Sequence, residues 1–304
     1  MAHNHSHSHE HPKLSGKNLL ISIFLNILIT VAQIIGGFLA GSLALISDAV
    51  HNLSDVVSLI VSYAANKLAN SKKQTLKQTF GFKRAEIIAA FFNAATLIVI
   101  AVMLGIEAIK RFNQEHTIES NIVIWLAFLG ILANGFSVLL LKKDAEHNLN
   151  MKSAYLHLLT DMLTSVAVLI GGIAMKYYHI YWIDAVLTLL ISVYLIYMSW
   201  RIFVDSLKIL MLFAPDDIVI EDIEKAIVKI DGVKNIHHVH LWQLNEKNCH
   251  FEAHIEFTKD IKLSDFDKIC EEIEHLLVHD FNINHCNLQP EFNRDDEKKF
   301  IIQD

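Results

Sequence analysis

The sequence predicts a helical membrane protein, in which a six-helix transmembrane domain is followed by a small α+β domain. Of the 304 residues, 53% are hydrophobic and only 19% are charged, whereas a soluble chain has about 25% charged residues. The charge is also unevenly spread, because residues 1–213 carry a net charge of +4 and residues 214–304 a net charge of −11. Such asymmetry indicates two parts in two different environments.

The composition also excludes some partners and cross-links. No segment combines dense positive charge with interleaved aromatic residues, which disfavours nucleic acid as a partner. The three cysteines, Cys249, Cys270 and Cys286, are an odd set confined to the acidic part. Such a set does not suggest a disulfide framework, so a reducing compartment fits these residues better.

Residues 1–16 predict a disordered, histidine-rich arm. The segment has no apolar pattern, and its five histidines alternate with other residues: His3, His5, His7, His9 and His11. Segments of this composition bind metal ions loosely. We therefore expect a native arm that captures ions.

Residues 17–213 contain six apolar stretches of membrane-spanning length. A helix needs roughly 20 residues to cross a hydrocarbon core about 30 Å thick. Three stretches have no charged residue, and the other three are interrupted by ionisable residues. In chain order the six are Leu19–Ala40, Ser42–Asn66, Ile87–Ile106, Asn121–Leu141, Ser153–Met175 and Ile183–Trp200. We therefore predict six transmembrane helices.

The basic residues predict that both termini lie in the cytoplasm. In that orientation the cytoplasmic side receives 13 lysines and arginines and the opposite side three, as the positive-inside rule requires. The loop over residues 66–84 supplies six of the 13 and contains no Asp, Glu or His, so we expect it to lie against anionic lipid. The expected location is the inner (cytoplasmic) membrane of the cell, with several membrane passes.

Residues 214–292 predict a cytoplasmic domain with the element order αββαβ. Pro215 closes the last membrane helix, and Asp216 or Asp217 can cap a helix that runs to Ile230. Periodicity and turn residues predict, in order, strands at Val233–Leu244 and His250–Phe257, a helix at Leu263–Asp280 and a strand at Ile283–Pro290. This order suggests a small sheet with helices on one face. The charged residues 293–304 are expected to form a frayed tail.

Four ionisable residues inside two predicted membrane helices form the strongest functional signal. His51 and Asp55 lie in the second helix, and His157 and Asp161 lie in the fifth. Ionisable groups in a membrane helix cost about 2.5–3.5 kcal/mol each on insertion scales, so they need an explanation. The spacing of four residues places each pair on one helix face, one turn apart. If the two faces oppose each other, two imidazoles and two carboxylates form a closed tetrahedral set for Zn²⁺.

Other interpretations of these residues remain open. The two pairs could be His–Asp hydrogen bonds that stabilise the bundle and bind no ion. An intramembrane metallohydrolase would also bury His and Asp, but it needs an H-E-x-x-H motif, which the sequence lacks, and an open zinc position. Asp48, seven residues before Asp55, either admits the ion or accepts a proton, or is hydrogen-bonded within the bundle.

Proton competition gives such a site a means of release. Histidine and carboxylate ligands must be deprotonated to bind metal, so metal affinity falls as protons arrive. A site that opens to a more acidic exterior would release its ion as His51 and His157 become protonated. Opening inward would release the protons and admit a new ion, which is proton–metal antiport by alternating access.

Four segments of the sequence are similar to those of a known family. They are Ser47–Asp55, His157–Asp161, Thr79–Glu86 and Ile236–Trp242. Together they resemble the cation diffusion facilitators, specifically their bacterial zinc-exporting branch, and the resemblance runs from about Leu14 to Glu291. It implies a homodimer, a ferredoxin-like cytoplasmic domain that binds metal, and exchange of Zn²⁺ for H⁺ across the cytoplasmic membrane. It also implies that the two His–Asp pairs form the transport site, in which His51 favours zinc.

The resemblance further implies a regulatory Zn²⁺ site in the cytoplasmic domain, with His237, His254, His285 and Glu291 as its ligands. Ordinary surface histidines are the competing explanation. In a regular strand, His237 would point away from His238 and His240. Some family members bind a second metal through Asp and His in the loop between helices two and three, and residues 66–84 lack both. Cation binding is expected to lower the repulsion between two domains of net charge −11 and to draw them together.

The combined interpretation is a secondary active zinc exporter and not an enzyme. The sequence has no P-loop motif G-x-x-x-x-G-K-[ST], which argues against an ATP-driven pump. One alternative is a membrane-embedded metal sensor or regulator that binds the ion without moving it. The other is the same antiporter with broader selectivity for Cd²⁺, Co²⁺ and Ni²⁺, because nitrogen and oxygen ligands accept several of these ions.

Overall fold

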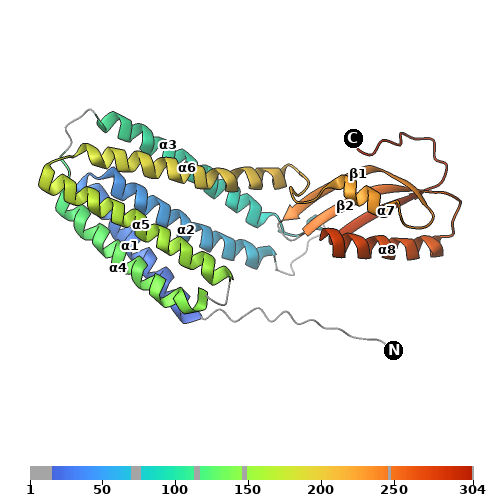
Figure 1. The fold of residues 1–304 in the computed structure, drawn as a ribbon, viewed down its shortest axis with the longest axis horizontal. Helices are drawn as coiled ribbons and strands as arrows, with labels where there is room; N and C mark the ends of the chain where they lie inside the picture. Colours follow the sequence, from blue (N-terminus) through green and yellow to red (C-terminus); the bar gives the residue numbers. More distant parts are fainter. Residues whose placement is uncertain (1–15, 70–76, 113–116, 146–148, 246–247, 303–304) are drawn as a thin grey trace. The chain divides into compact units, whose positions relative to one another are not determined.

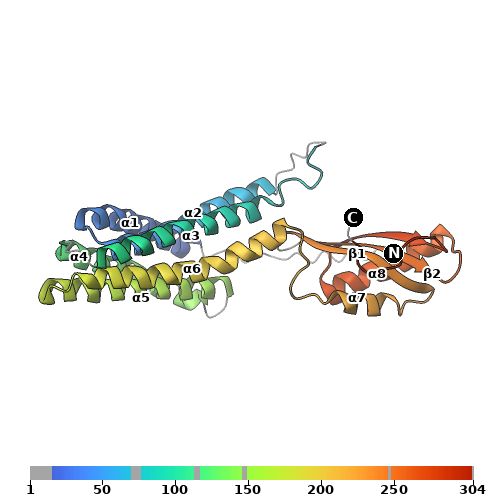
Figure 2. The same cartoon turned by 90° about the horizontal axis from the view of Figure 1, so that it is seen from above.

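The computed structural model describes residues 16–69, 77–112, 117–145, 149–245 and 248–302. Of the predicted histidine-rich arm (1–16), all but Gly16 lies outside these residues, and so does part of the basic loop. Two compact units divide the chain, residues 1–60 with 93–201 and residues 61–92 with 202–304. Figures 1 and 2 show the helices and strands of both units.

Six long helices occupy the region where the sequence predicts six. They are α1 (Gly16–Ala40), α2 (Leu43–Ala69), α3 (Ala85–Phe112), α4 (Ser120–Ala145), α5 (Leu149–Tyr178) and α6 (Trp182–Leu210). Within the first unit, α4 packs against both α1 and α5 (Figure 1). Large apolar side chains such as Phe38, Trp125 and Tyr197 are exposed on the helix surfaces, which is how a protein meets lipid rather than water.

Five of these helices, α1, α3, α4, α5 and α6, are long and apolar enough to cross a membrane. Of the six long helices in the described residues, α2 is the one outside this set, and its first half carries Asp48, His51 and Asp55. The chain is therefore a multi-pass membrane protein. The predicted span that is missing from this set is α2, which carries His51 and Asp55 of the predicted metal site.

A tight reversal joins α1 to α2. Gly41 has a φ of +70°, a left-handed conformation that glycine adopts without steric cost. The amide of Ser42 donates to the carbonyl of Gly37 at 3.1 Å, and this bond closes the end of α1. The reversal fixes where α2 begins, and hence the height of its ionisable residues in the bundle.

The C-terminal part forms a small α+β domain in the predicted element order. It contains α7 (Ile220–Ile227), β1 (Val233–Asn245), β2 (Asn248–Phe257), α8 (Leu263–Phe281) and β3 (His285–Glu291). The strand order is β1-β2-β3, with β1 antiparallel and β3 parallel to β2. In Figure 2, α7 and α8 lie on one face of the sheet. Buried apolar residues of both helices, such as Ile223 and Ile273, pack against strand residues such as Phe251.

Two local predictions for this domain are wrong. Neither Asp216 nor Asp217 caps α7, which begins after Val219 without a side-chain cap; Asp216 instead accepts hydrogen bonds from the Lys208 ammonium at 2.7 and 2.9 Å. The segment after β3 is also not frayed throughout. The carbonyls of Lys299 and Phe300 accept hydrogen bonds from the β1 backbone at 3.1 and 2.9 Å, because an edge strand has backbone groups to offer.

Candidate functional site

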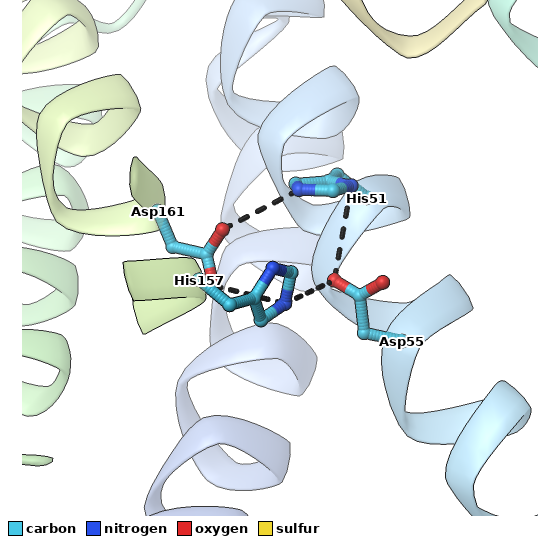
Figure 3. A group of neighbouring side chains, drawn as sticks. All are labelled: His51, Asp55, His157 and Asp161. Carbon is cyan, nitrogen blue, oxygen red and sulfur yellow. Dashed lines mark hydrogen bonds and ion pairs between the residues drawn. The ribbon is translucent and has the colours of Figure 1, made fainter. Parts of the chain in front are cut away.

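The two predicted His–Asp pairs of α2 and α5 converge in the structure. His51 and Asp55 project from α2, and His157 and Asp161 project from α5 toward them (Figure 3). One ligand atom from each residue lies within 4.8 Å of the other three. The spacing of four residues is responsible, because it places both members of a pair on the same helix face.

Of four short distances within this cluster, two match those of a tetrahedral zinc site and two lie just below and just above them. Zinc bonds to nitrogen and oxygen of about 2.0–2.2 Å place two ligand atoms about 3.3–3.6 Å apart. Nε2 of His51 and Nε2 of His157 lie 3.4 and 3.5 Å from the two carboxylate oxygens of Asp161. Oδ2 of Asp55 lies 3.0 Å from Nε2 of His157 and 3.8 Å from Nδ1 of His51. The types of the four ligands and their spacing within 4.8 Å therefore fit a zinc ion.

The cluster is closed on one side and open on the other. The side chains of Asp161 and His51 are 0% and 10% exposed, whereas those of Asp55 and His157 are 31% and 42% exposed. Asp55 lies nearer the C-terminal end of α2 than His51, and His157 lies nearer the N-terminal end of α5 than Asp161. The open side therefore faces the ends at which α2 finishes and α5 starts.

A buried polar cluster surrounds Asp48, one turn before His51 on α2. The Asp48 carboxylate accepts hydrogen bonds from Gln33 of α1 at 2.9 Å and from Thr164 and Ser165 of α5 at 2.8 and 3.3 Å. These bonds join three helices. Asp48 is not among the four converging ligands. Sequence reasoning missed its partners, although a glutamine inside the uncharged stretch of α1 was a signal.

Asp184 caps a helix other than its own. It lies in the first turn of α6, but its carboxylate accepts hydrogen bonds from the start of α2. These bonds come from the Ser42 hydroxyl at 2.5 Å and from the amides of Leu43 and Ala44 at 2.8 and 3.4 Å. A carboxylate at a helix N-terminus satisfies unpaired amides and complements the helix dipole.

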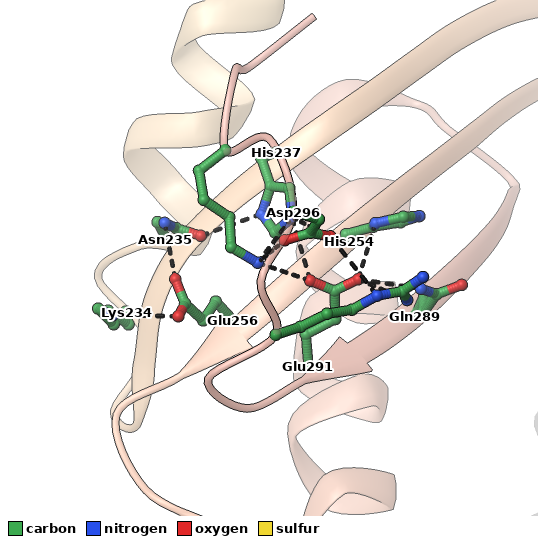
Figure 4. Close-up of polar contacts among 10 residues, drawn as sticks. Lys234, Asn235, His237, His254, Glu256, Gln289, Glu291 and Asp296 are labelled. Atoms are coloured by element: carbon green, nitrogen blue, oxygen red, sulfur yellow. Dashed lines mark hydrogen bonds and ion pairs between the residues drawn. The ribbon is translucent and has the colours of Figure 1, made fainter. Parts of the chain in front are cut away.

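A second group of metal-ligating side chains lies in the α+β domain (Figure 4). It consists of His237, His254, Glu291 and Asp296, with ligand atoms within 4.8 Å of one another. Nε2 of His237 lies 3.1 Å from Oε2 of Glu291, and Nδ1 of His254 lies 2.9 Å from Oε1 of the same carboxylate. Three of these residues are predicted ligands. Asp296 was missed because it lies in the segment expected to be a frayed tail.

His285 does not join this cluster, which corrects its predicted place in the ligand set. In the parallel pairing of β2 with β3, His285 lies opposite His250, whereas Glu291 lies opposite Glu256. Six residues of strand separate His285 from Glu291, a distance of about 20 Å. The His285 ring instead lies 4.6 Å from that of His250.

A β-bulge brings adjacent histidines of β1 to the same neighbour. The pairing register shifts between His237 and His240, and His238 has a φ of 51°. The rings of His237 and His238 consequently lie 5.4 and 4.6 Å from that of His254. The predicted alternation of their side chains is therefore wrong here, because a bulge inserts one residue into the strand.

The electrostatic surroundings favour the metal-binding forms of this second cluster. Burial alone would raise the pKa of Glu291, but hydrogen bonds from Lys298 and Gln289 outweigh it and hold the pKa below its ordinary value. Burial lowers the pKa of His254, although the neighbouring Glu291 charge opposes this shift. The carboxylate and the neutral imidazole are the forms that ligate metal.

The sequence also matches known proteins along almost its entire length. Residues 19–211 match the cation efflux transmembrane domain, and residues 215–292 match the cytoplasmic domain of cation efflux proteins. A "Cadmium, cobalt and zinc/H(+)-K(+) antiporter" of Bacillus subtilis (strain 168) is 33% identical over 293 residues, which cover 96% of this chain and 92% of the relative. "Zinc transporter ZitB" of Pectobacterium atrosepticum is 35% identical over 299 residues, covering 98% and 91%. ZitB of Escherichia coli (strain K12) is 33% identical over 293 residues, covering 96% and 92%. With its membrane helices, its α+β domain and these full-length matches, the chain belongs to the cation efflux family of membrane transporters.

Proposed function

We propose that the protein exports Zn²⁺ from the cytoplasm in exchange for protons, and that His51, Asp55, His157 and Asp161 bind the transported ion. The observation that carries the proposal is the convergence of two imidazoles and two carboxylates from α2 and α5, with ligand atoms within 4.8 Å of one another. That donor set and spacing suit tetrahedral zinc. Four protein ligands also leave no open position for an activated water, which favours transport over hydrolysis.

Exchange for protons follows from the contacts within the site. Nε2 of His157 lies 3.0 Å from the Asp55 carboxylate, so a proton on that imidazole is stabilised by an ion pair when zinc is absent. Zinc needs the same nitrogen without its proton, and the two cations therefore replace each other. If the site opens alternately to the two sides of the membrane, metal moves outward as protons move inward.

We infer that α2 is the sixth transmembrane helix and that both termini lie in the cytoplasm, in the inner membrane. The His–Asp face of α2 points to α5, which spares its ionisable residues contact with lipid. The Lys/Arg distribution supports this orientation. The more exposed Asp55 and His157 then lie at the cytoplasmic end, as a site that loads zinc from the cytoplasm requires. Asp48 is a proton acceptor for this site that also ties α2 to its neighbours.

We assign residues 17–213 to the transmembrane domain and residues 214–292 to a ferredoxin-like cytoplasmic domain, between the arm (1–16) and a charged tail (293–304). The β2-α8-β3 crossover and the β1-β2 hairpin support the assignment. The domain belongs to a homodimer and binds regulatory Zn²⁺ at the cluster of His237, His254, Glu291 and Asp296. Because residues 214–304 carry a net charge of −11, bound cations lower the repulsion between two such domains.

Zinc is the proposed principal substrate because His51 supplies a second imidazole to the site. A broader selectivity is a specific alternative, because one relative is named for cadmium and cobalt as well as zinc and nitrogen–oxygen sites accept several divalent ions. Competition of Cd²⁺, Co²⁺ and Ni²⁺ with zinc uptake distinguishes the two.

The test is zinc flux into sealed vesicles that contain the purified protein, under an imposed pH gradient. We expect flux that depends on the gradient and collapses when Asp161 is replaced by alanine. The matched control is Asp205→Asn, which changes an exposed acidic residue near the end of α6. Flux that persists in Asp161→Ala would exclude the proposed site.

The same preparation separates the alternatives. A sensor that does not transport would bind zinc in the wild type with loss of affinity in Asp161→Ala, but would show no flux. If the four residues merely stabilise the bundle, zinc affinity would be equal in the two proteins. Flux that does not respond to the pH gradient would refute proton exchange while leaving the metal site intact.

A further inference from the structure

The ammonium group of Lys298 lies inside the second metal-ligating cluster. Its Nζ lies 2.8 Å from Oε2 of Glu291 and 3.3 Å from Nε2 of His237, and it forms an ion pair with the Asp296 carboxylate. Lys298 thus contacts the same ligand atoms that lie close together in the cluster, since Oε2 of Glu291 is also 3.1 Å from Nε2 of His237. A lysine side chain therefore already contacts three of the four candidate ligands.

The hydrogen bonds around His237 define which of its nitrogens is available. An ammonium group has only donors, so Lys298 donates to the Nε2 lone pair. Nδ1 then carries the ring proton and donates to Oδ1 of Asn235 at 3.1 Å. The Asn235 amide is itself oriented, because its nitrogen donates to Glu256 at 3.0 Å. Partners of this kind fix a metal-binding histidine in the tautomer it needs.

Lys298 and a metal ion cannot occupy this cluster together. Both need the Nε2 lone pair of His237 and the carboxylates of Glu291 and Asp296, and a second positive charge within a few ångströms of the ammonium would be strongly repelled. The ammonium cannot become a ligand in this environment while it keeps its proton.

We propose that Lys298 is a built-in competitor for the regulatory metal, which must expel the lysine before it can bind. The inference rests on the proposed metal site of the cytoplasmic domain. Expulsion also loosens the following residues, because the carbonyls of Lys299 and Phe300 bond to β1 at 3.1 and 2.9 Å directly after Lys298. Metal binding would therefore weaken the hydrogen bonds by which Lys299 and Phe300 cover the outer edge of β1. Competition raises the metal concentration at which the domain responds.

The first experiment uses the wild-type protein and the reactivity of its lysines. Full-length protein in detergent is treated briefly with an amine-acetylating reagent, with and without saturating Zn²⁺, and each lysine is quantified by mass spectrometry. The Lys298 side chain is 26% exposed and held by two carboxylates, whereas that of Lys299 is 73% exposed. We expect zinc to accelerate acetylation of Lys298 about tenfold, the equivalent of losing one hydrogen bond to a charged group, and to leave Lys299 unchanged. Equal or slower acetylation of Lys298 in zinc would overturn the inference.

The second experiment measures zinc affinity by competition with a chromophoric chelator. Asp161→Ala is the common background, so that the transport site contributes little. We expect Lys298→Met to bind zinc at least tenfold more tightly at the domain site, because methionine keeps the chain length without the charge. Lys299→Met is the matched control and should leave the affinity unchanged.

Adding His237→Ala to the same background separates the proposed regulatory site from the proposed competition by Lys298. If this substitution removes no zinc binding, the regulatory site itself is refuted and the inference with it. If it removes binding but Lys298→Met and Lys299→Met have equal affinities, the site stands and the competitor is refuted. Thermal unfolding without zinc checks that Lys298→Met is folded, and the acetylation result decides the matter if it is not.

Discussion

Replacing Asp161 by asparagine is the sharpest single test of the proposed transport site, because it removes one charge and nearly preserves the side-chain shape. Asp161 is fully buried, and its two oxygens lie 3.4 and 3.5 Å from the imidazoles of His51 and His157. In a binding equilibrium, removing one partner of a buried charge pair costs about 2–5 kcal/mol. Since 1.4 kcal/mol is a factor of ten, we expect the zinc Kd of this site to rise by a factor between about 30 and a few thousand.

The assay is zinc competition with a chelator in detergent, in a His237→Ala background that silences the domain site. Asp205→Asn serves as the control for the loss of one acidic group. Thermal unfolding without zinc should place the Asp161→Asn protein close to its parent, so that weaker binding is not a folding defect. A zinc Kd within threefold of the parent value would refute the reasoning, since a buried ligand with two imidazole contacts cannot be dispensable.

Three further predictions concern stability and reactivity. Asp184→Ala removes the acceptor for three donors at the start of α2, so the free energy of unfolding should fall by about 2 kcal/mol. Thermal unfolding in detergent would show an unaltered midpoint if this cap were unimportant. Burial and the nearby Glu274 charge raise the pKa of Cys286 to about 12, so little of this thiol is in the reactive thiolate form at pH 8. Its alkylation at pH 8 should therefore be at least about 100-fold slower in the native than in the unfolded chain. Similar alkylation rates in the two states would contradict the raised pKa. Burial and the His285 charge lower the pKa of His250, so below about pH 6.5 the unfolded state binds more protons than the folded state. The free energy of unfolding of the domain should therefore decrease from pH 6.5 to 5.5. His250→Gln should flatten this pH dependence, and an unchanged slope in the variant would contradict the role of His250.

The convergence of the four candidate ligands was predictable because its determinants are local. A helix fixes the angle between residues four apart, so each His–Asp pair shares a face before any tertiary contact forms. The high cost of ionisable groups in a membrane helix then indicates that the two faces meet. The six long helices and the order of the α+β domain follow similarly from apolar length and periodicity.

The remaining features depend on contacts between segments that are distant in the sequence. Asp184 is an ordinary first-turn acid until the fold brings the start of α2 within 2.8 Å of it. The bulge at His238 breaks the two-residue period on which strand predictions rely. Asp296 joins the second cluster only because the chain turns back along β1 after β3. No local pattern in the sequence indicates the Asp184 cap, the bulge or the place of Asp296.

The hydrogen bonds of Asp184 to the start of α2 would make the two candidate zinc ligands of α2 move by different distances if this helix tilted. Leu43 is anchored by one of these bonds, and with a rise of 1.5 Å per residue His51 lies about 12 Å and Asp55 about 18 Å farther along the helix. A swing of α2 by about 10° around its anchored end would move these two side chains about 2 and 3 Å. Metal sites tolerate deviations of only about 0.2 Å. A tilt too small to unpack the bundle is therefore enough to dismantle the coordination sphere, and the ligand nearest the open side travels farthest.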